Sequence, residues 1–319
     1  MARVMADSLR RQHPEVPVLL GLTDDPGCLR GAGYPLEVLP LDELGLPGIE
    51  RFLFRCTRLE AAIAIKPFAL ERALDLGFDT AVYVDADVMV LGDISDLLRS
   101  AGHHAITLVP HLLEPLVGSD RVGRELNILQ SGTFNGGVLS VTDSDTSRAF
   151  LRWWQSRVFA DCRHSVEEGM HFDQRWLDLV PSYYEDVHVY DDPAINVAHW
   201  NLPERELGAC RLFHFSGYDP DRAEVMTRYS SRLSLDDVPE ARLLFARFRD
   251  AVLAAGWREA QRRPYAFGSF DNGVPIANTA RALYRDLGDE ADRFGDPFST
   301  GAGSFFRWLV EDVALAPVV

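Results

Sequence analysis

Two carboxylates, Asp85 and Asp87, follow directly on an apolar run that ends at Val84. Residues 80–84 have the composition of a buried strand, and side chains two positions apart in an extended chain point to the same side. An apolar strand that ends at carboxylates is typical of a central strand in an α/β sheet, whose carboxyl end faces a ligand crevice. Paired carboxylates there suit Mg²⁺ or Mn²⁺, and such an ion can bridge a diphosphate. The alternative is a helix N-cap or a solvated turn, because Asp-x-Asp is common by chance.

A second predicted strand, at residues 133–141, contains Asn135, Gly136 and Gly137 in succession. Two glycines inside a strand cost stability, so they usually mark either a bulge or the close approach of a ligand. This strand is therefore a second candidate for the wall of the crevice.

Apolar periodicity and turn residues place strands and helices in alternation along residues 1–220. The pattern predicts an α/β fold with a mainly parallel central sheet flanked by helices, followed by a helical extension. The predicted strands are residues 16–22, 36–39, 80–84, 105–109, 133–141, 187–190 and 212–215, and the main predicted helices are residues 1–12, 48–76 (kinked or restarted at Pro67), 93–98, 143–158, 170–179, 239–258, 278–287 and 304–315.

The first element has an unusual position. A helix at residues 1–12 feeds the strand at 16–22, and a helix that feeds a parallel strand normally has a strand before it. Either the sheet begins differently here or the chain starts one strand late. We expect residues 1–220 to form the catalytic core, with its first strand missing, and residues 221–319 to form a C-terminal extension for acceptor or oligomer contacts.

Composition excludes several classes of partner. The formal net charge of -16 over 319 residues argues against nucleic acid, because a basic face is needed to neutralise phosphates. No signal peptide opens the chain, and no apolar run reaches the ~18 residues of a membrane span. Cys28, Cys56, Cys162 and Cys210 are widely spaced, which fits a reducing compartment and no zinc site. We expect a cytoplasmic enzyme without a transmembrane segment.

Four features occur in a fixed order: a strand with Asp-x-Asp, a strand with Asn-Gly-Gly, a helix with Asp-Gln, and a strand with His-Phe-Ser-Gly. This succession resembles the nucleotide-sugar glycosyltransferases of the GT-A fold. Within them it is similar to glycosyltransferase family 8 and to related bacterial enzymes of polysaccharide and glycoside assembly. The resemblance covers most of the chain up to about Pro220.

The resemblance implies a role for particular residues of this sequence. It implies metal ligation by Asp85, Asp87 and His214, donor binding by Lys66, Asp85, Asn135, Gly136, Gly137, Ser216 and Gly217, and a catalytic role beneath the anomeric carbon for Asp173 and Gln174.

Each of these roles has an alternative. His214 lies between two phenylalanines and could be a core histidine, and Asp173 could simply stabilise a helix N-terminus. Lys66, which precedes a proline, could be a solvated surface residue. Trp200 is expected in the core, with stacking on an acceptor sugar as its alternative.

The activity implied is transfer of a sugar from a UDP- or GDP-sugar, with Mn²⁺ or Mg²⁺, to a hydroxyl of an acceptor glycan, glycolipid or small molecule. The family 8 likeness favours retention of the anomeric configuration. Two alternatives stay open: a sugar-phosphate nucleotidyltransferase, and a catalytically inactive GT-A-like binding protein. A homo-oligomer is also left open.

Overall fold

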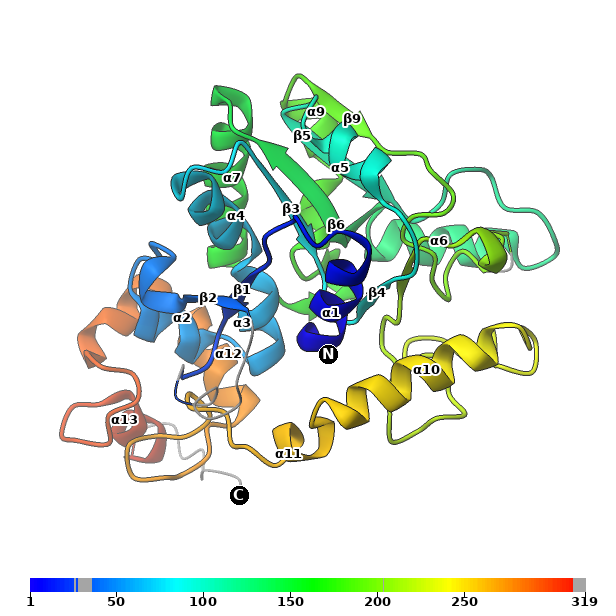
Figure 1. Ribbon diagram of the computed structural model, residues 1–319. Coiled ribbons are helices and arrows are strands. Elements are labelled where there is room, and N and C mark those ends of the chain that lie inside the picture. Colours follow the sequence, from blue (N-terminus) through cyan, green and yellow to red (C-terminus); the bar gives the residue numbers. More distant parts are fainter. Residues whose placement is uncertain (26, 28–35, 203, 312–319) are drawn as a thin grey trace.

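The computed structural model describes residues 1–25, 27, 36–202 and 204–311, which form an α/β structure with helices on both faces of a central sheet (Figure 1). The strands are β1 (Leu19–Leu22), β2 (Glu37–Pro40), β3 (Thr80–Val84), β4 (Val88–Val90), β5 (Ile106–Pro110), β6 (Phe134–Thr142), β7 (His164–Ser165), β8 (Met170–His171), β9 (Val187–Val189) and β10 (Leu212–His214). The helices are α1 (Ala2–Gln12), α2 (Ile49–Arg55), α3 (Arg58–Ala64), α4 (Lys66–Asp75), α5 (Ser95–Ala101), α6 (Arg121–Ser131), α7 (Asp145–Ala160), α8 (Gln174–Leu177), α9 (Val180–Tyr183), α10 (Ala241–Ala254), α11 (Trp257–Gln261), α12 (Asn278–Asp286) and α13 (Phe305–Glu311).

The central sheet has the strand order β3-β6-β5-β9. Strand β6 is antiparallel to both of its neighbours, and β9 is parallel to β5, so β3, β5 and β9 run in one direction. Neighbouring residues of one strand enter different cores: Leu108 packs with α4 and α7, whereas Val109 packs with α5. Because successive side chains of a strand point to opposite faces, these helices cover the two faces of the sheet. The predicted α/β class, with most strands in one direction, is confirmed.

Two smaller strand pairs flank this sheet. Strands β1 and β2 are parallel, with Leu19 opposite Glu37. Strands β4 and β10 are antiparallel, and His214 lies opposite Val88. No separate strand was predicted at residues 88–90. The turn at Asp85-Ala86-Asp87 ends β3, and β4 after it pairs with β10 whereas β3 pairs with β6.

The predicted helix at residues 48–76 is three helices. Thr57 and Glu60 form a reciprocal capping box that starts α3. Helix α4 begins at Lys66, with Pro67 in its first turn, where the missing N–H of proline costs nothing. This restart places Lys66 at the end of α4 that faces the carboxylates, and its side chain is buried.

The helices after residue 220 pack against the earlier part of the chain. The rings of Phe248 in α10 and Phe215 stack with centroids 3.8 Å apart. Arg281 in α12 is buried and donates hydrogen bonds to the carbonyls of Leu53, Phe54 and Cys56 at the end of α2. These contacts satisfy carbonyls that a helix C-terminus leaves unpaired.

Helix α6 was not predicted, and it buries none of its residues. Among the described residues Cys56, Cys162 and Cys210 are free, while Cys28 lies outside the described residues, as does the end of the helix predicted at residues 304–315. In the part of the chain that the structure describes, no helix has the length and apolar character needed to cross a membrane.

Candidate functional site

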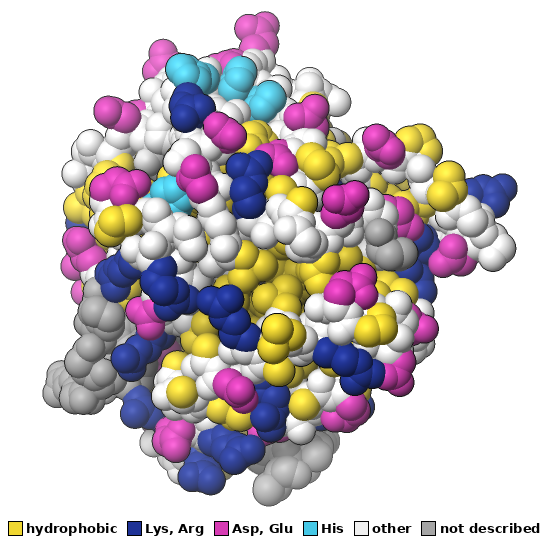
Figure 2. All heavy atoms as spheres, turned by 45° about the vertical axis from the view of Figure 1, so that its right-hand side comes forward, with side chains coloured by type: hydrophobic (Ala, Val, Ile, Leu, Met, Phe, Trp, Pro, Cys, Tyr) yellow, Lys and Arg dark blue, Asp and Glu magenta, His cyan; other side chains and the backbone are white. Residues whose placement is uncertain are grey.

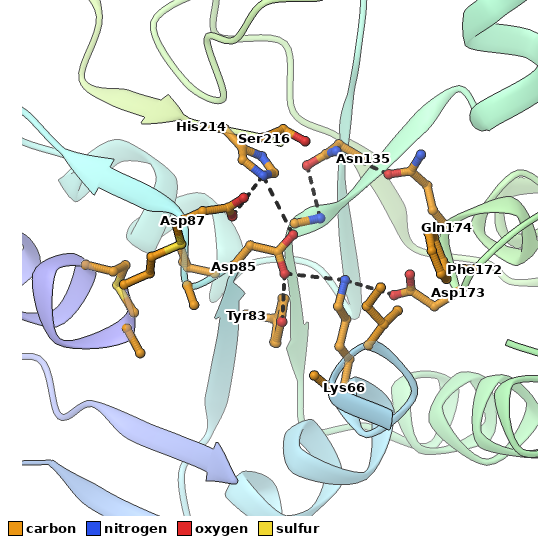
Figure 3. Close-up of a pocket in the computed structure, with 18 of the residues that line it drawn as sticks. Lys66, Tyr83, Asp85, Asp87, Asn135, Phe172, Asp173, Gln174, His214 and Ser216 are labelled. Carbon is orange, nitrogen blue, oxygen red and sulfur yellow. Dashed lines mark hydrogen bonds and ion pairs between the residues drawn. The ribbon is translucent and has the colours of Figure 1, made fainter. Parts of the chain in front are cut away.

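The turn between β3 and β4 brings Asp85 and Asp87 to the end of β10, where His214 lies (Figure 3). His214 Nε2 is 3.2 Å from Asp87 Oδ1 and 3.8 Å from Asp85 Oδ2, and one ligand atom from each of the three residues lies within 4.8 Å of the others. Adjacent ligands of an octahedral ion with bonds of about 2.1 Å lie about 3 Å apart. Small movements of these side chains would therefore place all three around one Mn²⁺ or Mg²⁺.

A hydrogen bond at His214 Nδ1 leaves the other ring nitrogen, Nε2, available to bind a metal. Its Nδ1 is 3.2 Å from Asn196 Oδ1, and both side chains are buried. With Asn196 accepting, Nδ1 carries a proton, so Nε2 is the nitrogen left to bind a metal. The backbone N–H of Phe215 donates to the carbonyl of Asp87 at 2.9 Å, which ties the two ligand-bearing segments together.

The charges of the three residues support one another. Burial alone would lower the pKa of His214, but Asp87 and Asp85 raise it above its ordinary value. Burial alone would raise the pKa of Asp87, but His214 lowers it below its ordinary value. His214 and Asp87 thus form an ion pair, and a cation bound here would replace the proton on His214 Nε2.

Gly137 in β6 forms the floor beneath the cluster. A Cβ at this position would lie 2.5 Å from Asp85 Oδ2 and 2.6 Å from His214 Cε1. The residue has ordinary strand geometry, so glycine is needed here for space and not for backbone conformation. Both interpretations of Asn-Gly-Gly have support. The register of β6 against β5 is irregular here, because Leu108 lies opposite Leu139 whereas Pro110 lies opposite Phe134, and side chains approach the strand closely at Gly137.

Lys66 is a buried cation with three acceptors. Its Nζ donates to the carbonyl of Gly136 at 2.8 Å and lies 3.1 Å from Asp173 Oδ2 and 3.5 Å from Asp85 Oδ1. Burial opposes its charge, but Asp173 and Asp85 raise the pKa of Lys66 above its ordinary value. Burial raises the pKa of Asp173 to about 6, although Lys66 acts in the opposite direction. Lys66 is therefore neither solvated nor at the surface, which excludes that alternative.

Gln174 shapes the strand that carries the glycines. Its Oε1 accepts hydrogen bonds from the Gly136 N–H at 3.0 Å and from Asn135 Nδ2 at 3.2 Å, and its Nε2 donates to the carbonyl of Ser131 at 2.6 Å. Asn135 Oδ1 in turn accepts from the Gly137 N–H at 3.0 Å. The amide of Gln174 is fully engaged, so the structure gives it a positioning role.

Asp173, the neighbour of Gln174, does not act as a helix cap, because no side-chain cap bond starts α8. Asp173 is buried, with 2% of the residue exposed. Its Oδ2 takes part in the ion pair with Lys66 and makes no hydrogen bond. A buried oxygen of this kind is poised to accept a bond from a ligand hydroxyl.

Tyr83 was missed in the sequence analysis. Its hydroxyl donates to Asp85 Oδ1 at 2.8 Å, and the Lys66 ammonium lies 5.0 Å from the centre of its ring. A signal existed, because Tyr83 and Asp85 are two positions apart on a strand and so share a side. Asn196 and His111 were also missed. His111 pairs with Asn135, and no local pattern in the sequence links either residue to the site.

A cavity of about 1290 Å³ opens over these residues. Its walls include Asp85, Asp87, Asn135, Gly137, Asp173, Gln174, His214, Ser216 and Gly217 from the predicted set, together with His111, Phe172, His199 and Trp200. A hollow with a hydrophobic floor and basic side chains along its lower rim is visible on this face of the molecule (Figure 2). Trp200 is half-buried at the wall and contacts His111 and His214 edge to face, so it belongs to the cavity and not to the deep core.

Gly217 has a left-handed backbone conformation (φ +71°), and a Cβ there would lie 2.5 Å from the Tyr229 ring. Its glycine is therefore required by the turn that follows β10. Gly136 is not part of the cavity wall; it contributes its carbonyl to Lys66 and its N–H to Gln174.

Comparison with known proteins gives one sequence relative and several structural neighbours. No family model matches the chain. The chain is 24% identical to the uncharacterized protein YfnD of Bacillus subtilis over 153 residues, which are 43% of this chain and 46% of YfnD. The matched region thus spans about half the length of that relative.

The structural neighbours are glycosyltransferases. They include the galactosyltransferase LgtC in complex with donor and acceptor sugar analogues (15% identity, 78% of this chain and 91% of that chain, TM-score 0.45). They also include GlyE of Streptococcus pneumoniae TIGR4 (14% identity, 84% of this chain and 62% of that chain, TM-score 0.46). A third is mouse xyloside xylosyltransferase 1 (14% identity, 67% of this chain and 90% of that chain, TM-score 0.37). Membership of glycosyltransferase family 8 stays a prediction.

Proposed function

We propose that this protein is a metal-dependent glycosyltransferase that moves a sugar from a nucleotide donor to an acceptor hydroxyl. The observation that carries the proposal is the cluster of Asp85, Asp87 and His214 at strand ends, with the buried cation Lys66 beside it. A nucleoside diphosphate is the ligand that such a pair of cations fits, because its two phosphates can bind a metal ion and an ammonium together.

Asp85, Asp87 and His214 would hold the ion, and the bound ion would offset the negative charge that develops on the departing diphosphate. Lys66 Nζ lies 3.5 Å from Asp85 Oδ1, so its positive charge would reach the same phosphates. Asp173 would accept hydrogen bonds from donor-sugar hydroxyls through its free Oδ2. Gln174, Asn135 and the strand glycines would keep this floor rigid, since their mutual hydrogen bonds fix the backbone beneath the sugar.

In the reaction, the acceptor oxygen bonds to the anomeric carbon as the bond from that carbon to the diphosphate oxygen breaks. The proton of the acceptor hydroxyl passes to the leaving diphosphate. We propose retention of configuration, because Asp173 is ion-paired with Lys66 and Gln174 is fully hydrogen-bonded. Neither residue is a free base for attack from the opposite face. A product whose NMR coupling constants report an inverted anomeric centre would contradict retention.

The finer features of the proposal follow from the sequence. The donor is a UDP- or GDP-sugar, the ion is Mn²⁺ or Mg²⁺, and the acceptor is a glycan, a glycolipid or a small molecule with a free hydroxyl. The site residues assigned above, a cytoplasmic location, and a C-terminal extension at residues 221–319 that contacts the acceptor or a second copy are part of the same proposal.

The test is calorimetric titration with Mn²⁺ and with UDP or GDP, each in the presence and absence of the other. We expect nucleotide binding that depends on Mn²⁺, and its loss in Asp87→Ala. Asp191→Ala, which removes an exposed carboxylate outside the cavity wall, is the matched control and should bind as the wild type does. Binding of nucleoside triphosphates alone would favour a nucleotidyltransferase, and Mn²⁺ affinity unchanged in Asp87→Ala would refute the metal site.

A further inference from the structure

The cavity extends beyond the carboxylates as a slot between β1 and β3. Its volume of about 1290 Å³ exceeds the ~300–1,000 Å³ of an ordinary small-ligand site. Residues 17–21 form one wall and residues 80–84 the other. Ile65, together with Ala69 and Ala73 of α4, lines one face of the slot. The other face is formed by Met5, Leu9, Val16, Val90, Ile94 and Leu98. An extended space with apolar helices on both faces has the surroundings of a buried β-strand.

The two walls are strands with free edges. Among the described residues β1 pairs only with β2, and β3 pairs only with β6. The backbone N–H and C=O groups on the edges that border the slot therefore lack a strand partner, which is costly for a buried sheet. Every residue of β1 and most residues of β3 are only half-buried. Strand β5, which is similarly apolar but has a partner on both edges, is buried at every position.

The N-terminal end of α1 opens into this slot. The carbonyl of Met1 accepts hydrogen bonds from the N–H groups of Val4 and Met5, so the helix starts at the first residue. Helix α1 is held in place by Ser8, whose Oγ accepts from the Val90 N–H at 2.9 Å, and by His13, whose Nε2 accepts from the Ile94 N–H at 3.0 Å. Figure 1 shows the N-terminus at the lower end of α1.

Met1 packs against the apolar cluster that contains Met89, two positions after the candidate metal ligand Asp87. Burial lowers the pKa of the Met1 α-amino group, and the charge of Asp87 acts on it in the opposite direction. Met1 itself is part of the cavity wall. Backbone that leads into Met1 must therefore come through the slot, and it arrives at the edge of the sheet where β3 ends.

We propose that the slot seats a β-strand that continues the chain on the N-terminal side of Met1, lies between β1 and β3, and joins β2-β1 to the central sheet. Because this strand would finish beside Asp87, at the same edge where β3 finishes, it runs parallel to β3. Helix α1 is then the crossover between the new strand and β1, as in a right-handed βαβ unit. Because β1 has four residues and β3 has five, the proposed strand between them has about five residues. Its side chains are apolar on both faces, since both faces are covered by apolar residues.

The composition of the walls distinguishes this occupant from a small molecule. Between β1 and β3 the slot presents Pro17, Val18, Leu19, Leu20 and Gly21 on one side and mainly alanine and valine on the other. A nucleotide needs polar partners for its base and ribose. The polar side chains of these two walls are Thr80 and Tyr83, and their hydroxyls already pair with Thr142 Oγ1 and Asp85 Oδ1. Backbone edges, in contrast, satisfy an added strand on both sides.

The first test is the native start of the chain. The protein is produced from its own chromosomal locus with a C-terminal tag, and its intact mass and N-terminal sequence are determined. We expect the chain to begin at least about five residues before Met1. A native chain that begins at Met1 or Ala2 would overturn the proposal.

The second test compares that native chain with the 319-residue chain by hydrogen exchange and thiol labelling. Amides of β1 and β3 should exchange about a hundredfold more slowly in the native chain, while those of β5 serve as the internal control. Leu20→Cys, at the slot, should react with a thiol reagent about a hundredfold more slowly in the native chain. Leu243→Cys, at a side chain that is 80% exposed, should react alike in both. Equal exchange and equal labelling of the slot positions in the two chains would show that no strand occupies it.

Discussion

Replacement of Gly137 by alanine tests the site through a single methyl group. The new Cβ would lie 2.5 Å from Asp85 Oδ2, which is 0.9 Å inside an ordinary contact of 3.4 Å, and 2.6 Å from His214 Cε1. Both neighbours are proposed metal ligands, and His214 is buried and cannot swing into solvent. We therefore expect Mn²⁺ affinity to fall about 10–100-fold, as it does when ligands lose their orientation. The free energy of unfolding should fall by about 1–3 kcal/mol because the added methyl overpacks the floor.

Titration calorimetry with Mn²⁺ and thermal unfolding measure the two effects separately. Gly136→Ala is the matched control on the same strand, because its Cβ would meet Asp173 Oδ2 at 3.1 Å, Asp173 Oδ1 at 3.3 Å and Lys66 Nζ at 3.4 Å, and no proposed metal ligand. Gly123→Ala in α6, where nothing lies within 4 Å, should stabilise by up to about 1 kcal/mol through helix propensity. If Gly137→Ala bound Mn²⁺ within twofold of the wild type, Asp85 and His214 could not be ligands of one ion in this geometry.

Four other changes probe the same network. Lys66→Met should lower the free energy of unfolding by about 3–5 kcal/mol in chemical denaturation, because it leaves Asp173 buried without its cation. The double variant Lys66→Met with Asp173→Asn should recover part of this loss. An unchanged free energy of unfolding in Lys66→Met, or no recovery in the double variant, would contradict a stabilising pair. Tyr83→Phe should cost about 0.5–1.5 kcal/mol and weaken Mn²⁺ binding, since Asp85 loses its donor; unchanged titrations would make the bond irrelevant. His214→Ala should weaken Mn²⁺ binding in calorimetry, and unchanged affinity would return this residue to a purely structural role. Burial raises the pKa of Asp173 to about 6, so between about pH 4 and pH 6 the folded state binds a proton that the unfolded state has lost. The free energy of unfolding should therefore fall as the pH rises through this range. The fall should be smaller in Asp173→Asn, and an equal fall in both proteins would show that Asp173 does not titrate there.

Local pattern predicted much of the fold because strands and helices carry their own periodicity. The apolar run before Asp85, the glycines of β6 and the restart of α4 at Pro67 are all visible within a few residues of sequence. Helix α6 was not predicted, although Val122, Leu126 and Leu129 have helical spacing. These three side chains are exposed, so their stripe does not face the core. Strand β4 was also not predicted, because three apolar residues after a turn do not by themselves show which strand they pair with.

The candidate site shows the same difference between features visible in local sequence and features that depend on long-range packing. Local sequence is enough to predict carboxylates at the end of a buried strand, because the alternation of strand side chains is a local property. The tertiary structure pairs β10 with β4 and so brings His214 to within 3.2 Å of Asp87. It likewise decided that Lys66 meets Asp173 in a buried ion pair across 107 positions of sequence, and that β1 and β3 border an open slot. Pairing between distant segments depends on how whole faces pack together, and that information is spread over the chain and not held by any one motif.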